Sequence, residues 1–299
     1  GSDFFGIDPK NLFLLTSDVT ITIHCGAMIN WALPYSAHYL SNVQGTANLL
    51  ALSLYMNEKL KKENGKEVLF CHISTLGLLC GGVLDEVCPT PTTGLSSKGG
   101  YAQSKWVAEQ LVMLTMCEFS LKSLIVRPGT ITNSTVLGSG NKKDFVNLLM
   151  CGLIQEEVYS LDPQLSQFPF QFNLCPVDFV AGATIALISL GGKTKPPIPV
   201  YHCNASTLTS LSELVSWSKS KGYPLKETTA QEFASKLNEI KDTSHPLFVF
   251  QTVLSQTREI DIQTQGDKST KMAIPSTKNT ISSLKRCKEN EVSHLFDIQ

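Results

Sequence analysis

Short runs of apolar and β-branched residues alternate with longer segments of helical periodicity in the first half of the chain. The runs at 19–23, 68–73 and 123–126 predict three strands, and the second is apolar throughout except for one histidine, as is typical of a strand buried on both faces. The segments from 42 to about 62 and from 101 to about 117 carry apolar residues at helical spacing. This alternation of strands and helices predicts a parallel sheet with crossover helices, which places the chain in the α/β class.

The second half of the chain continues this pattern through one more predicted helix and strand, at 179–190 and 198–203. From about residue 207 onward the pattern changes to mostly polar segments of helical periodicity. We therefore expect residues 1–206 to form the sheet-containing core and residues 207–299 to form a smaller, mostly helical subdomain.

Composition limits the class of protein. The 299 residues carry a formal net charge of −1 and show no basic cluster, so neither nucleic acid nor a membrane surface is expected as a partner. No run reaches the ~18 apolar residues of a membrane-spanning helix, and no signal peptide is visible. The nine cysteines include no Cys-x-x-Cys pair, which argues against a disulfide framework and against a metal site. A reducing, cytoplasmic location fits this cysteine usage.

Tyr101 and Lys105 lie four positions apart at the start of a predicted helix, directly after Gly99 and Gly100. On a helix this spacing puts both side chains on one face. The phenol has an ordinary pKa of about 10, and a neighbouring ammonium group would lower that pKa. Such a pair can exchange a proton with a carbonyl oxygen, although the spacing also occurs by chance.

Three strand ends supply further candidate residues. Cys25–Ala27 follow the first predicted strand, Ser74 and Thr75 follow the second, and Arg127–Gly129 end the third. Because ligands bind beyond the carboxyl ends of parallel strands, these residues should line one cleft. Structural roles are the alternative, with Thr75 as a turn cap and the segment at 25–27 as a plain turn.

For four other polar residues near these positions, structural roles are considered beside or ahead of catalytic ones. Asn42 either anchors a helix or serves as a simple N-cap, and Asp178 is more typical of an N-cap than of a catalytic acid. His24 and His72 flank the strand ends and are interpreted as core or rim histidines rather than acid–base groups.

Six short motifs, taken in order, resemble those of the extended short-chain dehydrogenase/reductases. The form Gly-Tyr-x-x-Ser-Lys-Trp-x-Ala-Glu is similar to the thioester reductase branch, which comprises terminal reductase domains of polyketide synthases, nonribosomal peptide synthetases and carboxylic acid reductases. The resemblance covers about residues 18–204. The motifs are His24–Ala27 with Asn30 and Trp31, Asn42–Thr46, Ile73–Thr75, Gly100–Glu109, Arg127–Gly129 and Pro176–Asp178.

This resemblance implies a Rossmann-like fold, with a parallel sheet flanked by helices, and NADPH as the cofactor. It identifies Thr75, Tyr101 and Lys105 as the catalytic residues. The two hydroxyl groups would polarise a substrate carbonyl, Tyr101 would donate the proton, and Lys105 would bond the nicotinamide ribose. The residues that would lie against the cofactor are Cys25, Gly26, Ala27, Ser74, Tyr101, Lys105 and Pro128.

The implied activity is reductive release of an acyl thioester. The substrate would be carried on the phosphopantetheine arm of an acyl or peptidyl carrier protein and reduced to an aldehyde, and a second round would give an alcohol. The C-terminal subdomain would form the substrate wall and the carrier docking surface. Two alternatives remain: a fatty acyl-CoA reductase or other extended reductase, and a truncated, non-catalytic interaction domain.

The chain departs from the family pattern at its start. Members of the family begin with a strand, a Gly-x-x-Gly-x-x-Gly turn and a helix that bind the pyrophosphate, whereas no such motif precedes Val19. We therefore expect the N-terminal strands of the nucleotide fold to be missing from this chain. We also expect an apolar edge and face of the sheet to be exposed.

Overall fold

The computed structural model describes residues 6–30, 33–79, 84–88, 95, 99–165, 171–193, 197–251 and 274–289. The chain divides into two compact units, of which unit 1 comprises residues 1–129, 179–203 and 275–299 and unit 2 comprises residues 130–178 and 204–274. This interleaved division differs from the single boundary expected after residue 206. A change of periodicity marks where helices begin, but it does not reveal which core each segment joins.

Within its described residues, unit 1 contains a four-stranded parallel sheet in the order β1-β2-β3-β8. The strands are β1 (Ile21–His24), β2 (Leu69–Ile73), β3 (Lys122–Pro128) and β8 (Val200–Cys203). In the register of the sheet, His24 pairs with His72, and His72 pairs with Ile125. β2 and β3 are buried along almost their whole length, as their apolar runs predict. The predicted α/β class with a parallel sheet is confirmed.

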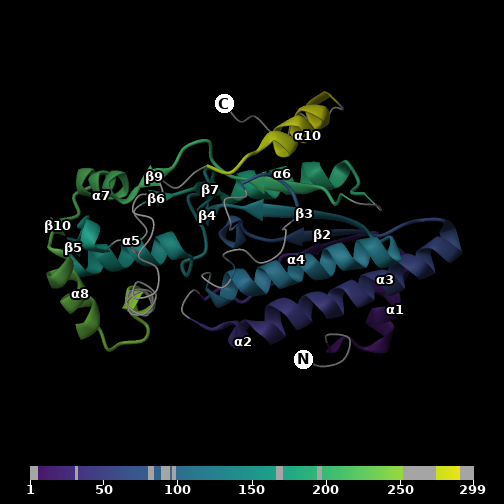
Figure 1. Ribbon diagram of the computed structural model, residues 1–299, viewed down its shortest axis with the longest axis horizontal. Helices are drawn as coiled ribbons and strands as arrows, with labels where there is room; N and C mark the ends of the chain where they lie inside the picture. The colour runs from purple at the N-terminus through teal and green to yellow at the C-terminus, as the bar shows by residue number, and fades with distance from the viewer. Residues whose placement is uncertain are drawn as a thin grey trace. The chain divides into compact units, whose positions relative to one another are not determined.

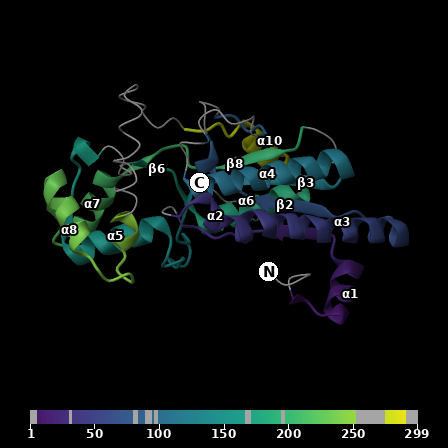
Figure 2. The ribbon, with the colours of Figure 1, turned by 60° about the horizontal axis from the view of Figure 1, so that its bottom comes forward.

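Helices connect these strands. α3 (Gly45–Asn64) and α4 (Gly100–Phe119) lie side by side (Figure 1). α10 (Lys278–Glu289) packs along β8 (Figure 2). α1 (Pro9–Asp18) packs on α3 (Figure 2), and α6 (Val177–Ser189) precedes β8 in the chain. Apolar side chains from helices and strands together form the core of unit 1, which includes Leu50, Met56, Leu60, Phe70, Val112, Met116 and Ile125.

The helix predicted to begin at residue 42 starts earlier. α2 (Tyr35–His38) runs through a π-helical turn (Tyr39–Gln44) into α3 without a break. Asn42 therefore lies inside a helical segment, and the N-cap role considered for it is wrong. π-helical turns often occur at functional sites. A 3₁₀ turn, Leu76–Leu78, follows β2.

A buried carboxylate fastens the C-terminal helix to the sheet. Glu86 accepts hydrogen bonds from the backbone N–H of His202 on β8, at 2.9 Å, and from that of Thr280 at the start of α10, at 3.0 Å. It also accepts from the Asn279 N–H and the Thr280 hydroxyl. A carboxylate in this position satisfies N–H groups that the first turn of a helix leaves unpaired. The 84–88 segment, β8 and α10 are thereby held together.

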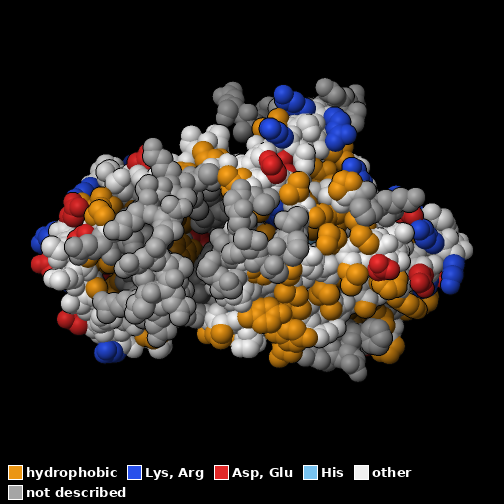
Figure 3. All heavy atoms as spheres, in the orientation of Figure 1, with side chains coloured by type: hydrophobic (Ala, Val, Ile, Leu, Met, Phe, Trp, Pro, Cys, Tyr) orange, Lys and Arg blue, Asp and Glu red, His pale blue; other side chains and the backbone are white. Residues whose placement is uncertain are grey.

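β1 lies at one edge of the described sheet, and its apolar side chains are exposed. Ile21 and Ile23 remain 46% and 40% exposed. Hydrophobic side chains also gather on the surface over α2 and α3 (Figure 3), a segment whose exposed apolar residues include Leu40 and Tyr55. The exposed apolar sheet edge that the sequence predicts is therefore present.

Unit 2 combines helices with short strand pairs. Its core contains Leu149, Leu153, Phe172, Phe233 and Phe250. The helices are α5 (Phe145–Glu156), α7 (Leu211–Ser220) and α8 (Ala230–Glu239), and a 3₁₀ turn spans Pro163–Leu165. The strand pairs are β4 (Thr130–Thr132) with β7 (Leu174–Pro176), β5 (Val158–Tyr159) with β10 (Lys226–Glu227), and β6 (Gln171–Phe172) with β9 (Thr209–Ser210).

Asp178 has a structural role, but not as an N-cap. It lies within the first turn of α6, and each of its carboxylate oxygens is 3.2 Å from the Thr135 backbone N–H. The Thr135 hydroxyl donates to the same carboxylate. Asp178 therefore fixes the turn that begins near Thr135, and the N-cap interpretation is wrong.

Candidate active site

The first turn of α4 lies directly against the segment that leads into α2. A Cβ atom on Gly100 would lie 2.3 Å from the backbone nitrogen of Tyr35 and 2.4 Å from the carbonyl carbon of Pro34. Both atoms are backbone and cannot move aside easily, so only glycine permits this close approach. The contact sets the position of Tyr101, the next residue of the helix.

Lys105 is buried, with 2% of its surface exposed, and its ammonium group is directed at the carboxyl end of β2. Nζ donates a hydrogen bond to the Ile73 carbonyl oxygen at 2.7 Å and lies 3.2 Å from His72 Nε2. Burial lowers the pKa of Lys105 to about 8, and the nearby Glu109 carboxylate opposes this shift. The ammonium form therefore predominates at neutral pH.

Tyr101 lies one turn before Lys105 and is also buried. Burial raises the pKa of Tyr101 to about 12, and its ring meets the His38 ring edge-on, with 6.0 Å between centroids. The expectation that Lys105 lowers the pKa of Tyr101 is therefore wrong for this structure. The physical reason is that the ammonium group bonds β2, while burial of the phenol disfavours the charged phenolate.

Two hydroxyl groups follow β2. Thr75 Oγ1 accepts a hydrogen bond from the Gly77 N–H at 3.1 Å and so caps the 3₁₀ turn, which is the structural role considered for it. A hydroxyl that accepts in this way still has its own proton to donate. Ser74 is 4% exposed, and its Oγ has no hydrogen-bond partner among the described residues. Both side chains can therefore still donate to a ligand oxygen.

His24 and His72 are neutral core histidines. The Thr46 hydroxyl donates to the Asn42 carbonyl at 2.6 Å, so it must accept from His24 Nε2, 2.8 Å away. Burial, followed by the charge of Lys105, lowers the pKa of His24 to about 4 and that of His72 well below its usual value. Neither ring is an acid–base group near neutral pH, in agreement with the sequence interpretation.

Asn42 links the loop after β1 to α4. Its Oδ1 accepts from the Met28 N–H at 2.7 Å, and its Nδ2 donates to the Met28 carbonyl at 3.0 Å and to Ser104 Oγ at 2.9 Å. Ser104 in turn donates to the Tyr101 carbonyl at 2.7 Å. Both the oxygen and the nitrogen of this buried amide are thus used to hold the loop against the helix that bears Tyr101 and Lys105.

The remaining predicted cofactor residues have different surroundings. Cys25 is exposed as a residue, but partial burial of its thiol raises the pKa of that group, and the charge of Lys105 opposes this shift. A Cβ on Gly26 would meet only the His24 ring, at 3.7 Å, so packing within the protein does not require a glycine there. Ala27 is half-buried, and Pro128 is buried at the end of β3, opposite Cys203 of β8.

A buried ionic network behind α4 was not anticipated. Arg127 donates through Nε to Glu109 Oε1 at 2.9 Å and through Nη2 to Oε2 at 2.6 Å, and both side chains are buried. Arg127 Nη1 also lies 3.2 Å from His202 Nε2, while His202 Nδ1 donates to the Ser276 carbonyl at 2.9 Å. The sequence held one usable signal, because Glu109 follows Lys105 by four residues and so shares its helix face.

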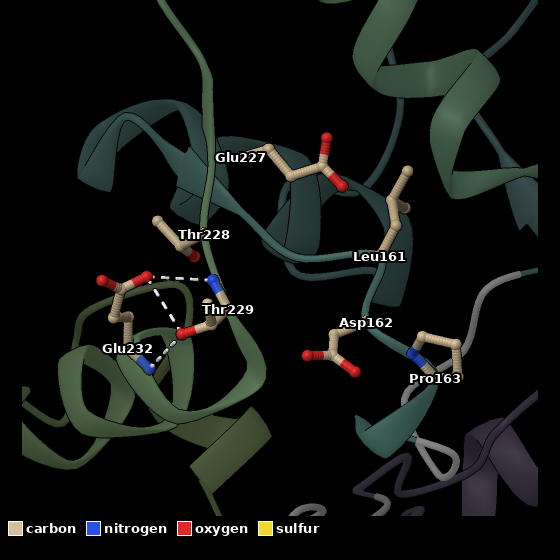
Figure 4. A pocket seen from close by; sticks show the side chains of 7 residues that line it. All are labelled: Leu161, Asp162, Pro163, Glu227, Thr228, Thr229 and Glu232. Atoms are coloured by element: carbon tan, nitrogen blue, oxygen red, sulfur yellow. Dashed lines mark hydrogen bonds between the residues drawn. The ribbon is translucent and has the colours of Figure 1, made fainter.

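A concave region in unit 2, of about 460 Å³, is lined by three carboxylates that all have structural partners (Figure 4). Glu232 and Thr229 form a capping box at the start of α8, and Asp162 accepts from the Ala230 N–H. Glu227 accepts from the Tyr159 hydroxyl. These contacts account for the acidic lining without a ligand.

The described residues contain no group of His, Cys, Asp and Glu side chains arranged to hold a metal ion. None of their helices has the length and apolar character needed to cross a membrane.

Comparison with known proteins extends the picture. A family model described as male sterility protein, of the NAD-binding type, matches residues 1–184. The chain is 28% identical over 251 residues to the L-2-aminoadipate reductase large subunit of Eremothecium gossypii and 27% identical over 270 residues to the nonribosomal peptide synthetase asaC of Aspergillus flavus. These matches take in 82% and 86% of this chain but 18% and 25% of the relatives, so the chain spans a quarter of their length or less.

Solved structures share the fold. The terminal R domain from the myxalamid PKS-NRPS biosynthetic pathway aligns with a TM-score of 0.71 at 24% identity, covering 95% of this chain and 67% of that one. The reductase domain of a nonribosomal peptide synthetase from Mycobacterium tuberculosis aligns with a TM-score of 0.66 at 22% identity, covering 95% and 66%. The resemblance inferred from the six motifs is thus confirmed. Because the family model matches more than half of this chain, the chain belongs to the male sterility protein family of NAD-binding domains.

Proposed function

We propose that this chain carries the active site of an NADPH-dependent reductase that releases a carrier-bound acyl thioester as an aldehyde. Its relatives named as aminoadipate reductases and nonribosomal peptide synthetases support the reaction class. The choice of NADPH over NADH, the aldehyde product and the roles of individual residues are parts of the proposal.

One observation carries the proposal. The Lys105 ammonium group lies 2.7 Å from the carbonyl oxygen of Ile73. Ile73 is two residues before Thr75, and Lys105 is one helical turn after Tyr101. An ammonium and two hydroxyl groups thus come from two elements that meet at the carboxyl end of β2. This is where a parallel sheet binds its ligands.

The residues at this end of the sheet fit the nicotinamide half of such a cofactor. Lys105 bonds two partners among the described residues, which leaves one of its three N–H donors for a ribose hydroxyl. Ser74 offers a buried hydroxyl without a partner in the described part of the chain, and the residue at position 26 leaves room beside His24. When bound, the cofactor would supply the hydride.

The protein groups act on the carbonyl oxygen of the substrate. Thr75 and Tyr101 donate hydrogen bonds to that oxygen, which stabilises the charge that develops as hydride reaches the carbon. Tyr101 then gives its proton to the oxygen, so the thioester becomes a hemithioacetal. Breaking the carbon–sulfur bond, with the hydroxyl proton passing to the sulfur, yields the aldehyde and the free thiol. The raised pKa of Tyr101 keeps the phenol in its protonated form at neutral pH.

A carrier protein that bears the phosphopantetheine thioester is the proposed partner. Relatives that are nonribosomal peptide synthetases, and the resemblance to terminal reductase domains, support this choice. We assign substrate and carrier binding to residues 207–274, the part of the expected C-terminal subdomain that belongs to unit 2.

Turnover of NADPH with an acyl thioester on a carrier protein tests the proposal. Tyr101→Phe removes the proton donor, so kcat should fall by about 10²- to 10⁴-fold. Tyr159→Phe is the matched control, because Tyr159 is an equally buried tyrosine of unit 2 whose hydroxyl bonds Glu227. It should keep activity close to wild type. Equal rates for wild type and Tyr101→Phe would remove the proton-donor role.

Two comparisons separate the alternatives. A fatty acyl-CoA reductase would turn over the CoA thioester in preference to the carrier-bound one. A non-catalytic interaction domain is favoured by the exposed Ile21 and Ile23 on β1, and for that function equilibrium dialysis should show no binding of NADPH. Clear binding would exclude a cofactor-free domain.

A further inference from the structure

Among the described residues, the Lys105 ammonium group has two hydrogen-bond partners, and both belong to β2. One is the Ile73 carbonyl oxygen at 2.7 Å, and the other is Nε2 of His72 at 3.2 Å. His72 is fully buried, because β2 lies between β1 and β3. A buried imidazole is thus placed directly against a charged group of the proposed active site.

The charge of Lys105 fixes the tautomer of this imidazole. An ammonium group can only donate hydrogen bonds, so His72 Nε2 must accept and the ring proton must be on Nδ1. Nδ1 of His72 has no partner among the described residues, so this tautomer leaves a buried N–H unpaired. An unpaired N–H is unfavourable inside a protein and needs a reason in a native structure. The hydrogen bond to Lys105 provides that reason.

In the described part of the chain, the hydrogen bonds of Lys105 go to β2 and not to the other ionisable groups that face it. Glu109 gives both carboxylate oxygens to Arg127, and His24 bonds a threonine on α3. Among the described residues, His72 is therefore the ionisable side chain that bonds the ammonium group. Besides His72, the ionisable groups that face Lys105 are Tyr101 and Glu109 on α4, His24 on β1 and Cys25 directly after β1.

We propose that His72 is a positioning residue for Lys105: by accepting a hydrogen bond from the ammonium group, it holds that group at the end of β2 and keeps it protonated. The charge then stays one turn from Tyr101 and near Thr75, where the substrate carbonyl would bind. The consequence for catalysis rests on the proposed reductase function, whereas the consequence for the charge of Lys105 does not.

The charge can be followed by NMR in protein isotopically labelled at lysine Cε, with Lys105→Met used to assign the signal. His72→Phe keeps a buried ring but removes the acceptor, so the pKa of Lys105 should fall by about one unit. His72→Gln, whose amide oxygen can reach the position of Nε2, should restore most of the wild-type pKa. His24→Phe is the matched control: it removes a buried histidine on the neighbouring strand that does not bond Lys105, and the pKa should not change.

The wild-type protein provides a second measurement that does not depend on any variant folding. Nitrogen–proton NMR correlations of the histidine rings should show His72 protonated on Nδ1 at neutral pH. A ring protonated on Nε2 would overturn the proposal. So would an unchanged Lys105 pKa in folded His72→Phe, or an equal fall in His24→Phe.

Kinetics then distinguish failure of this inference from failure of the proposed function. Lys105 carries its charge below its pKa, so in His72→Phe the alkaline limb of the kcat/KM profile should move about one pH unit lower. If wild type reduces no thioester but the Lys105 pKa depends on His72, the proposed function fails and the inference stands. If the alkaline limb moves while the NMR pKa does not, the inference fails.

Discussion

At the scale of single residues, the buried charges of unit 1 are held as hydrogen-bonded sets. Arg127 and Glu109 form a two-pronged pair, and His202 lies against the remaining side of the guanidinium group. Because both charged groups have lost their hydration, the arrangement is favourable only while both are present. The pair holds α4 to β3, and it therefore holds Tyr101 and Lys105 near the strand ends.

Glu109→Gln should lower the free energy of unfolding by about 3 kcal/mol, because it leaves the Arg127 charge buried without its anion. Urea denaturation measures this loss. Glu67→Gln is the matched control: Glu67 pairs with Lys61 and Lys122 at 2.7 Å each, but the lysines are exposed, and the loss should stay below about 1 kcal/mol. Similar losses in the two variants would contradict a special role for the buried pair.

Sequence reasoning could predict residues whose relation is local. Tyr101 and Lys105 share a helix face because of their spacing, and Ser74 and Thr75 were found because they follow an apolar run. The contact of Lys105 with His72 could not be predicted, because it depends on how α4 is set against β2. That setting comes from tertiary packing, which no local pattern contains.

At the scale of elements, the strands and α4 lie close to where the pattern places them, whereas the helix that precedes β2 does not. Its observed start at Tyr35 was missed because Pro34 and the small polar residues near it are typical of a loop. The π-helical turn at 39–44 is also invisible to a search for a period of 3.6 residues. That turn nevertheless carries Asn42, which connects the β1 loop to α4.

Gly100→Ala should destabilise the protein by at least about 2 kcal/mol, since the new Cβ would collide with backbone atoms of Pro34 and Tyr35. Turnover should fall as well, because α4 must shift at the residue before Tyr101. Gly45→Ala is the matched control, as a Cβ there finds its nearest atom at 3.8 Å and alanine favours a helix. Thermal unfolding of both variants measures the effect, and equal midpoints would contradict it.

At the scale of the molecule, the response to acid can be followed through two buried histidines of unit 1. Burial lowers the pKa of His24 and of His202 to about 4, against an ordinary value of 6.5. In the unfolded chain these rings take up protons as pH falls below about 6.5, while in the folded protein they stay neutral down to about 4. Their stabilising contribution is therefore complete above pH 6.5 and is lost progressively toward pH 4.

Each of these two histidines should remove roughly 3 kcal/mol of stability between pH 6.5 and pH 4. Denaturant unfolding at a series of pH values measures this slope. His202→Gln retains an acceptor for Arg127 but does not titrate, so its slope should be shallower than that of wild type. An unchanged slope would show that the pKa of His202 is the same in the folded and unfolded protein, which would contradict this prediction.

The division of the molecule was the least predictable feature. A boundary after residue 206 follows from a change in composition, but residues 130–178 and 275–299 each pack with a partner segment distant in sequence. The C-terminal helix illustrates the difficulty, because it is short and polar, and its place is revealed by its contacts with Glu86, with β8 and, through Cys287, with α6. Amphipathic pattern predicts that such a helix exists, but not which surface it covers.

The contacts of the segment that leads into α10 have a consequence for any shortened form of this protein. The Ser276 carbonyl fixes the His202 ring, which supports the guanidinium group that in turn braces α4. A residue from the last quarter of the chain therefore supports a structure formed mainly by the first half. Removing the residues from 275 onward should therefore weaken the packing of α4, the helix that carries the proposed catalytic residues Tyr101 and Lys105.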